Sequence, residues 1–294
     1  MDLAELASAL LPYRFSWLAV LFFGLAALSY GRGIRVLAAR GERIAWWRQV
    51  TFWLGLLLAY SVMHTQFDYY AQFMFFLHRA QHLALHHIAP LLIALSNPWR
   101  ILCAGVPEGR TKSALARILA SAPVRWTYRV LQFPPVAAAL FVGLIFFWLQ
   151  PEVHFYAMLS EPRYLLMNWS MWLDGLLFWW MMLDPRPPRE AGTWCFGRRA
   201  LLIWVVTMPQ LVLGAYIATS KTILYDVYEV CGRAWPIDPL NDQLLGGVLT
   251  WIPPGMMGVL AMVIVLRHLL HNDNRPDSED EQAVRRGSLQ GDTL

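Results

Sequence analysis

Charged residues and cysteines are scarce in this chain of 294 residues. Asp, Glu, Lys and Arg make up 15% of it, whereas soluble domains usually contain about 25%. The three cysteines, Cys103, Cys195 and Cys231, are too few and too scattered for a disulfide framework or a cysteine-based metal site. These absences exclude a soluble enzyme, a disordered protein and a disulfide-stabilised secreted domain.

Catalytic motifs are missing as well. The sequence contains no nucleophile elbow, no phosphate-binding loop, no pair of catalytic carboxylates and no CxxCH motif for haem attachment. We therefore expect a protein that is not an enzyme.

Apolar residues, by contrast, make up 57% of the chain, which has a mean hydropathy of +0.40 and 15 tryptophans. A transmembrane helix needs about 20 largely apolar residues, and Trp is enriched at membrane interfaces. The sequence therefore predicts an all-α, polytopic membrane helical bundle over residues 1–271 and a disordered polar tail over residues 272–294. About seven transmembrane helices are expected, at residues 15–33, 46–65, 69–97, 131–149, 164–184, 199–219 and 243–268.

The basic residues are unevenly distributed between the loops. Most of the 24 Lys and Arg residues lie in segments 31–49, 98–130 and 185–199 and in the tail. Cytoplasmic loops carry an excess of basic residues, so we expect the N-terminus outside and the C-terminus in the cytoplasm. The net charge of +4 then indicates orientation, not a nucleic-acid partner. Apolar residues also predict a short interfacial helix at residues 111–120.

Ionisable residues inside predicted spans are costly and indicate function, and the third span has the most of them. His78, His82 and His86 follow each other at i, i+4 and i+8, close to one helical face. His78 and His82 lie about 6 Å apart along the axis, so they can share a metal ion. His86 is expected too far along the axis for the same ion, and His87 is expected to point the opposite way. The alternative is that these side chains only form hydrogen bonds between helices.

Partners for such a site are expected at the outer ends of other spans. His64 ends the second span, Asp242 opens the seventh, and His154 follows the fourth. Imidazole with carboxylate suits copper, zinc or iron, and thioether sulfur favours Cu(I). The candidate sulfurs, which can equally be core fillers, belong to Met63, Met74, Met256 and Met257.

Arg79 and Asp174 have opposite charges within the third and fifth spans. We expect them to form an ion pair between these spans, or to line an ion path.

Two motifs resemble one family. His78-Arg-Ala-Gln-His82, followed by Ile88-Ala-Pro-Leu-Leu and Asn97-Pro98, resembles the HMxQH…APPLLxLGxP signature of the CtaG family, the caa3-type cytochrome c oxidase assembly factors. The segment from Asp242 to Gly255 resembles that family's DQxxGGxxMWxPG motif.

The resemblance implies a multi-pass bacterial inner-membrane protein that helps supply copper to haem–copper oxidases, with oxidase subunits or other assembly factors as partners. The functional positions that it implies are His78, Gln81, His82, Asp242, Gln243 and Trp251, and His154 is similar in place to a family histidine. The chain departs from the family at several positions that are often Met or His in relatives: Leu83, His86, His87, Tyr164, Asn168, Ser170 and Thr250.

The leading hypothesis is thus a non-catalytic, chaperone-like assembly factor that binds copper through His78 and His82, with His64 or Asp242 completing the site. One alternative is a b-type haem protein in which His64 and either His78 or His82 ligate the iron. The others are a metal or proton transporter that uses the histidine stripe with Arg79 and Asp174, and a structural subunit without metal.

Overall fold

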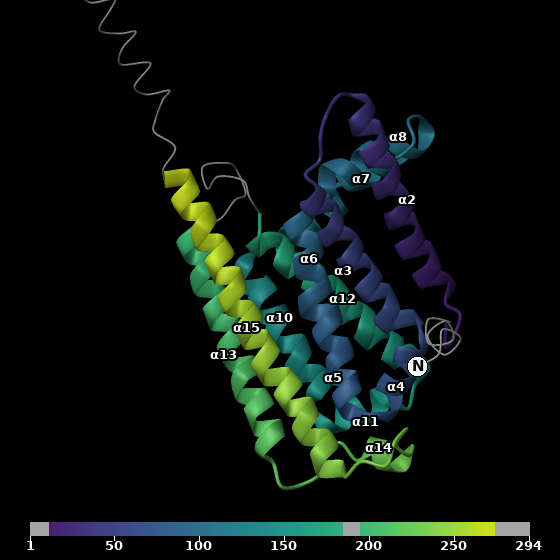
Figure 1. Cartoon of the computed structure of the whole chain (residues 1–294), viewed down its shortest axis with the longest axis vertical. Coiled ribbons are helices and arrows are strands. Elements are labelled where there is room, and N and C mark those ends of the chain that lie inside the picture. The colour runs from purple at the N-terminus through teal and green to yellow at the C-terminus, as the bar shows by residue number, and fades with distance from the viewer. Residues whose placement is uncertain (1–11, 185–194, 274–294) are drawn as a thin grey trace, which may run out of the picture.

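The computed structural model describes residues 12–184 and 195–273, and all regular elements within these ranges are helices (Figure 1). The predicted all-α class is therefore confirmed. Helices occupy six of the predicted stretches as single elements: α2 (Trp17–Ala39), α3 (Trp46–His64), α10 (Pro134–Leu149), α12 (Glu161–Met182), α13 (Phe196–Thr219) and α15 (Pro239–Asp273). The last helix continues past the predicted domain end at residue 271, and residues 274–294 of the predicted tail lie outside the described residues.

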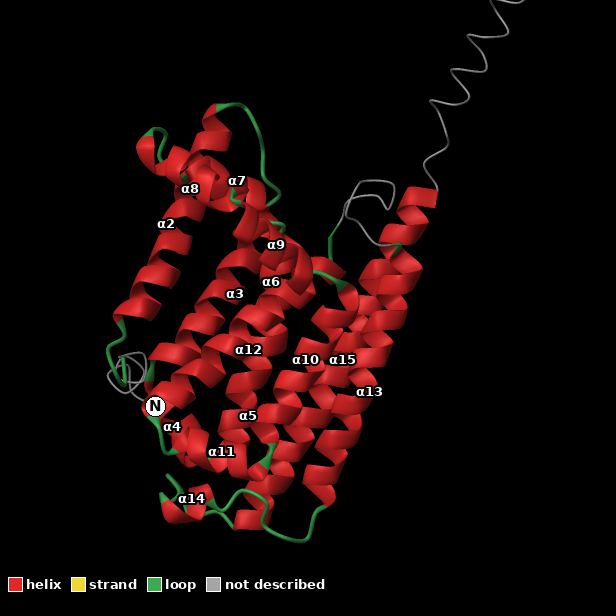
Figure 2. Ribbon diagram, turned by 180° about the vertical axis from the view of Figure 1, so that it is seen from behind, coloured by secondary structure: helices red, strands yellow, loops and turns green. Residues whose placement is uncertain are grey.

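Shorter helices connect these elements. The basic segment after the third stretch forms α7 (Trp99–Gly105), α8 (Arg110–Ala120) and α9 (Ala122–Leu131), and α8 confirms the helix expected at residues 111–120. The opposite end of the bundle carries α11 (Pro151–Met158) and α14 (Val227–Val230), as Figure 2 shows.

The third stretch is divided into α4 (Gln66–Phe73), α5 (Phe75–Leu83), the π-helical turn η1 (Ala84–Ile88) and α6 (Ala89–Ser96). Pro90 explains the π-helical turn, because proline has no N–H to donate to the carbonyl of His86. That carbonyl instead accepts a hydrogen bond from the indole of Trp179 at 3.1 Å. The divided stretch is central, since its segments pack against α3, α12 and α15.

By length and composition, three helices could each cross a membrane: α2, α13 and α15 over Pro239–Leu270. Two further pairs pass the same test as bent spans, Phe75–Ser96 with Trp99–Gly105 at 73° and Ala122–Leu131 with Pro134–Leu149 at 70°. The described residues therefore contain three to five candidate spans, which indicates a helical membrane protein. The count of seven and the orientation stay predictions.

Helices α13 and α15 form a long antiparallel pair, in which glycines bring the two backbones together (Figure 1). A Cβ on Gly247 would lie 2.4 Å from the amide nitrogen of Ala218, and one on Gly214 would lie 2.7 Å from that of Trp251. Small residues at helix contacts allow this close packing in membranes. Gly247 of the second motif and Gly214 opposite it therefore have a packing role.

Gly247→Ala is expected to lower the free energy of unfolding by about 1–3 kcal/mol, because the added methyl group forces α13 and α15 apart. Thermal unfolding in detergent measures the effect. Gly143→Ala in α10 is the matched control, since an added Cβ there meets open space among the described residues. Equal unfolding midpoints for the two variants would contradict the packing role.

Candidate functional site

Three histidines lie together near the end of the bundle that carries α11 and α14. The ring centroid of His78 lies 4.3 Å from that of His82 and 5.0 Å from that of His154. Helix α5 contributes the first two rings and α11 the third, and all three side chains are buried. We call His78, His82 and His154 the histidine cluster.

Two members of the cluster are fixed in one tautomer by their neighbours. Nδ1 of His82 lies 3.5 Å from the guanidinium of Arg79, which only donates, so this nitrogen accepts and Nε2–H donates to Asn168 at 3.1 Å. Nδ1–H of His154 donates to the carbonyl of Trp148 at 3.1 Å, so its Nε2 accepts from the hydroxyl of Tyr228 at 3.0 Å. Each ring therefore presents one lone pair to a donor.

His154 lies on α11, outside the predicted spans, and is neutral at physiological pH. Burial lowers its pKa to about 3, although the hydrogen bond to the backbone of Trp148 opposes this shift.

His78 differs from its neighbours, because neither of its ring nitrogens makes a hydrogen bond of normal geometry among the residues described, although the ring interacts with the backbone of Ala71. Its side chain is nevertheless fully buried. Buried polar groups are nearly always hydrogen-bonded, and an exception calls for an explanation such as a bound water or ion. His78 is thus the member of the cluster most readily available as a ligand.

Gln81 ties four helices together. Its Nε2 donates to the carbonyl of Val62 at 2.6 Å and to Asp68 at 2.8 Å, and its Oε1 lies 3.0 Å from the hydroxyl of Tyr164. That hydroxyl also lies 2.7 Å from Oδ1 of Asp68. The motif glutamine therefore holds α5 against α3, α4 and α12, beside the histidine cluster.

Asp242 is fully buried, and its two oxygens bind backbone and arginine. They accept hydrogen bonds from the amides of Phe75 at 3.1 Å and Phe76 at 2.9 Å, and from Nε of Arg233 at 3.1 Å. A carboxylate at the first turn of a helix satisfies unpaired N–H groups and interacts favourably with the helix dipole. The structure thus places Asp242 as the cap of α5.

The other two residues of the second motif also make structural contacts. Gln243 accepts from the amide of Leu224 at 2.7 Å and donates to the carbonyl of Thr222 at 3.1 Å, so it holds the loop before α14. Trp251 is partly exposed, and its backbone packs on Gly214.

The structure does not gather the four predicted metal ligands around one point. The ring of His64 packs against Phe15 and Tyr60, with centroid distances of 5.8 and 5.1 Å, and Asp242 caps α5. Within residues 12–184 and 195–273, no three His, Cys, Asp or Glu side chains are grouped so that they could hold a metal ion. A copper ligand set would therefore consist of fewer residues of these types, or include other donors.

The predicted ion pair between Arg79 and Asp174 is wrong for the described part of the chain. Nε of Arg79 donates to the hydroxyl of Thr250 at 2.9 Å, and Asp174 lies 3.0 Å from Nε2 of His86. His86 lies in η1, about two turns beyond Arg79, and it takes the place beside Asp174 that the sequence assigned to Arg79.

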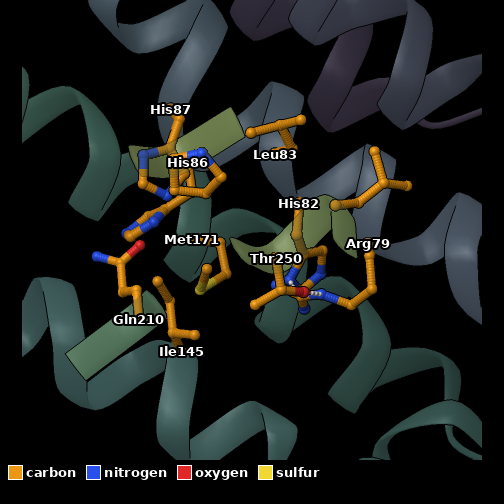
Figure 3. Close-up of a pocket in the computed structure, with 11 residues that line it drawn as sticks. Arg79, His82, Leu83, His86, His87, Ile145, Met171, Gln210 and Thr250 are labelled. Atoms are coloured by element: carbon orange, nitrogen blue, oxygen red, sulfur yellow. Dashed lines mark hydrogen bonds between the residues drawn. The ribbon is translucent and has the colours of Figure 1, made fainter. Parts of the chain in front are cut away.

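A small cavity of about 10 Å³ lies next to the histidine cluster, between η1, α12, α13 and α15 (Figure 3). His82 belongs both to the cluster and to the cavity wall. His87, which was expected to point away from the other histidines, also borders the cavity, and its ring centroid lies 5.0 Å from that of His86. The π-helical turn changes the helical phase at this point, which corrects the prediction. The lining comprises Arg79, His82, Leu83, His86, His87, Ile145, Met171, Gln210, Leu249, Thr250 and Pro254.

Sequence reasoning missed four side chains that shape these sites. Asp68 and Tyr228 hydrogen-bond to Gln81 and His154, while Met171 and Gln210 line the cavity. Asp68 lies just outside an apolar stretch, and Tyr228 lies between the last two predicted spans. Only the presence of Met171 and Gln210 inside predicted spans could have drawn attention to them.

Comparison with known proteins identifies a family and two relatives. A sequence model of the family described as "Cytochrome c oxidase caa3 assembly factor" matches residues 28–272. Two uncharacterised proteins, Mb0105 of Mycobacterium bovis and MT0111 of Mycobacterium tuberculosis, are each 24% identical over 291 residues. The alignment covers 94% of this chain but 42% of each relative, so the chain spans less than half the length of the curated relatives that it matches. No solved structure matches the chain.

Proposed function

Because the chain belongs to the family of cytochrome c oxidase caa3 assembly factors, we propose that it helps to mature a haem–copper oxidase by carrying copper through its histidine cluster. Copper is then the cargo, and no bond of a substrate needs to be made or broken. The partners are oxidase subunits or other assembly factors in a bacterial inner membrane. Family membership supports the role in oxidase maturation, and the histidine cluster contains nitrogen donors that can ligate copper.

The observation that carries this proposal is His78, a fully buried imidazole whose nitrogens make no hydrogen bond of normal geometry among the described residues and whose ring interacts only with the backbone of Ala71 and neighbouring rings. Its neighbour His82 is the best second ligand. Asn168 holds the Nε2–H of His82, which is how the outer partner of a metal-ligating histidine orients the ring. The other nitrogen faces only a long, 3.5 Å contact with Arg79.

The place of the cluster supports entry of copper from one side. It lies towards the end of the bundle that carries α11 and α14, while the basic helices α8 and α9 lie elsewhere, towards the opposite end (Figure 2). If the positive-inside rule holds for this chain, the cluster is nearer the outer face. We propose this orientation together with the seven-span topology.

His78→Ala is expected to lower copper per purified protein and oxidase activity in cells at least several-fold, because it removes the free donor of the cluster. His64→Ala is the matched control, since His64 is also inaccessible to solvent and makes no side-chain hydrogen bond within the described ranges, yet packs against Phe15 and Tyr60. Unchanged copper and unchanged activity in His78→Ala would reject the proposal. An absorption spectrum of the same sample separates it from the haem alternative, which requires a Soret band.

A further inference from the structure

His86 has the bonding pattern of a metal ligand, at a place separate from the free donor of the histidine cluster. Its Nε2 lies 3.0 Å from an oxygen of Asp174. With Asp174 ionised this oxygen only accepts, and Nε2 then carries the proton. Its Nδ1 is left with the lone pair. This nitrogen is buried and has no hydrogen-bond partner in the part of the chain that the structure describes. A carboxylate holding one nitrogen while the other is free is the usual environment of a metal-bound histidine.

The cavity beside His86 brings other donors to the same place. His87 from η1 and Met171 from α12 border it, and Figure 3 shows the amide of Gln210 turned towards the two histidines. The Oε1 atom of Gln210 makes no hydrogen bond of normal geometry with described side chains or backbone, although this side chain interacts with the ring of His87. At about 10 Å³ the cavity has room for about one water-sized sphere. The cavity is thus the size of a single small ion or one water, and polar atoms line it.

The chemistry of these donors selects the ion. Imidazole nitrogens combined with a thioether sulfur favour Cu(I) over Mg²⁺ or Ca²⁺, which prefer oxygen ligands. Charge points the same way. The carboxyl group of Asp174 lies beside His86, and Arg79 supplies a positive charge on the cavity wall next to Thr250. A monovalent ion is therefore opposed less than a divalent one in this buried setting.

From these observations we infer a second Cu(I) site, formed by Nδ1 of His86, the sulfur of Met171 and the ring of His87. The inference deepens the proposed function, on which it rests for the identity of the cargo. His82 belongs to both the histidine cluster and the cavity wall, so it links the first site to the second along α5 and η1. Copper bound at His78 thus has a next set of donors deeper in the bundle.

X-ray absorption at the copper edge tests this site, because it detects sulfur among the ligands directly. The full-length protein, purified in detergent, is loaded anaerobically with one and then two equivalents of Cu(I). We expect a sulfur scatterer in the wild type and its loss in Met171→Leu, a substitution that nearly conserves volume. Met167→Leu is the matched control, since Met167 lies one turn earlier on α12 and belongs to the same buried apolar cluster as Met171, but only Met171 borders the cavity. This control keeps the sulfur signal.

A second variant tests the carboxylate. Asp174→Asn is expected to weaken Cu(I) binding at this site by 10–100-fold, while His78→Ala leaves the sulfur signal in place. A wild-type spectrum with nitrogen ligands alone that responds to His78→Ala overturns the second site and leaves the proposed function standing. If the spectrum contains sulfur, but neither copper binding nor oxidase activity changes in His78→Ala, the proposed role of His78 is overturned and the second site stands. Absence of bound copper, with only water in the cavity, overturns both.

Discussion

Replacing Asp242 by alanine is expected to destabilise the protein by about 3–5 kcal/mol, the range for breaking a buried ion pair by removing one partner. The substitution leaves two amides at the start of α5 without an acceptor and leaves Arg233, whose side chain is only 12% exposed, without its 3.1 Å partner. Because α5 carries His78 and His82, a frayed first turn also displaces the histidine cluster. Thermal unfolding and copper content of the same preparation measure the two effects.

Asp238→Ala provides the control for this prediction. Asp238 accepts hydrogen bonds from the amides of Leu240 and Asn241 at the start of α15, but it does so at the surface. Loss of an exposed helix cap costs about 1 kcal/mol, and this variant is expected to keep its copper. If the two variants unfold at the same temperature, the buried role assigned to Asp242 is wrong.

Raising the pH from about 4 to 7 is expected to destabilise the protein through Asp68 by about 2 kcal/mol. Burial raises the pKa of Asp68 to about 6, against the lowering effect of hydrogen bonds from Tyr164, Gln81 and Gln72. An aspartate in the unfolded chain titrates near 3.9. Between these values the folded protein holds a proton that the unfolded chain has released, so stability is greatest below about pH 4 and falls until about pH 6.

Asp68→Asn isolates this contribution from other titrating groups. The asparagine keeps an oxygen that can accept from Tyr164 and Gln81, but it has no proton to lose. Unfolding midpoints measured at pH 4, 5, 6 and 7 are expected to fall more steeply in the wild type than in the variant. Parallel curves would show that Asp68 does not titrate in this window.

Much of the fold could be predicted from the sequence because apolar stretches of about 20 residues leave helices as the natural structure in a membrane. Single helices lie at residues 46–65 and 199–219 almost as expected. The third stretch escaped this reasoning. Its polar residues lowered the hydropathy signal. The carbonyl of His86, which Pro90 leaves without a donor, accepts a hydrogen bond from Trp179, and that residue is 93 positions further along the chain.

The site was predictable only where one helix determines it. The i, i+4 spacing brings His78 next to His82, as helix geometry requires. Which residues of other helices contact the site depends on how each helix is rotated about its axis. A helix that is apolar on all sides gives no sequence signal for that rotation. His64 therefore turned out to face Phe15 and Tyr60, and Asp174 to bind His86 in place of Arg79. Asp242 was found at the right helix start, but its role as a cap requires the fold.

The central claim is that copper binds within the bundle through a ring nitrogen of His78. The most direct test is an anaerobic competition titration of Cu(I) on the purified full-length protein and its His78→Ala and His64→Ala variants. We predict that His78→Ala lowers the amount of tightly bound copper per chain, while His64→Ala matches the wild type. Equal binding by all three proteins, or no binding by any of them, would contradict the account.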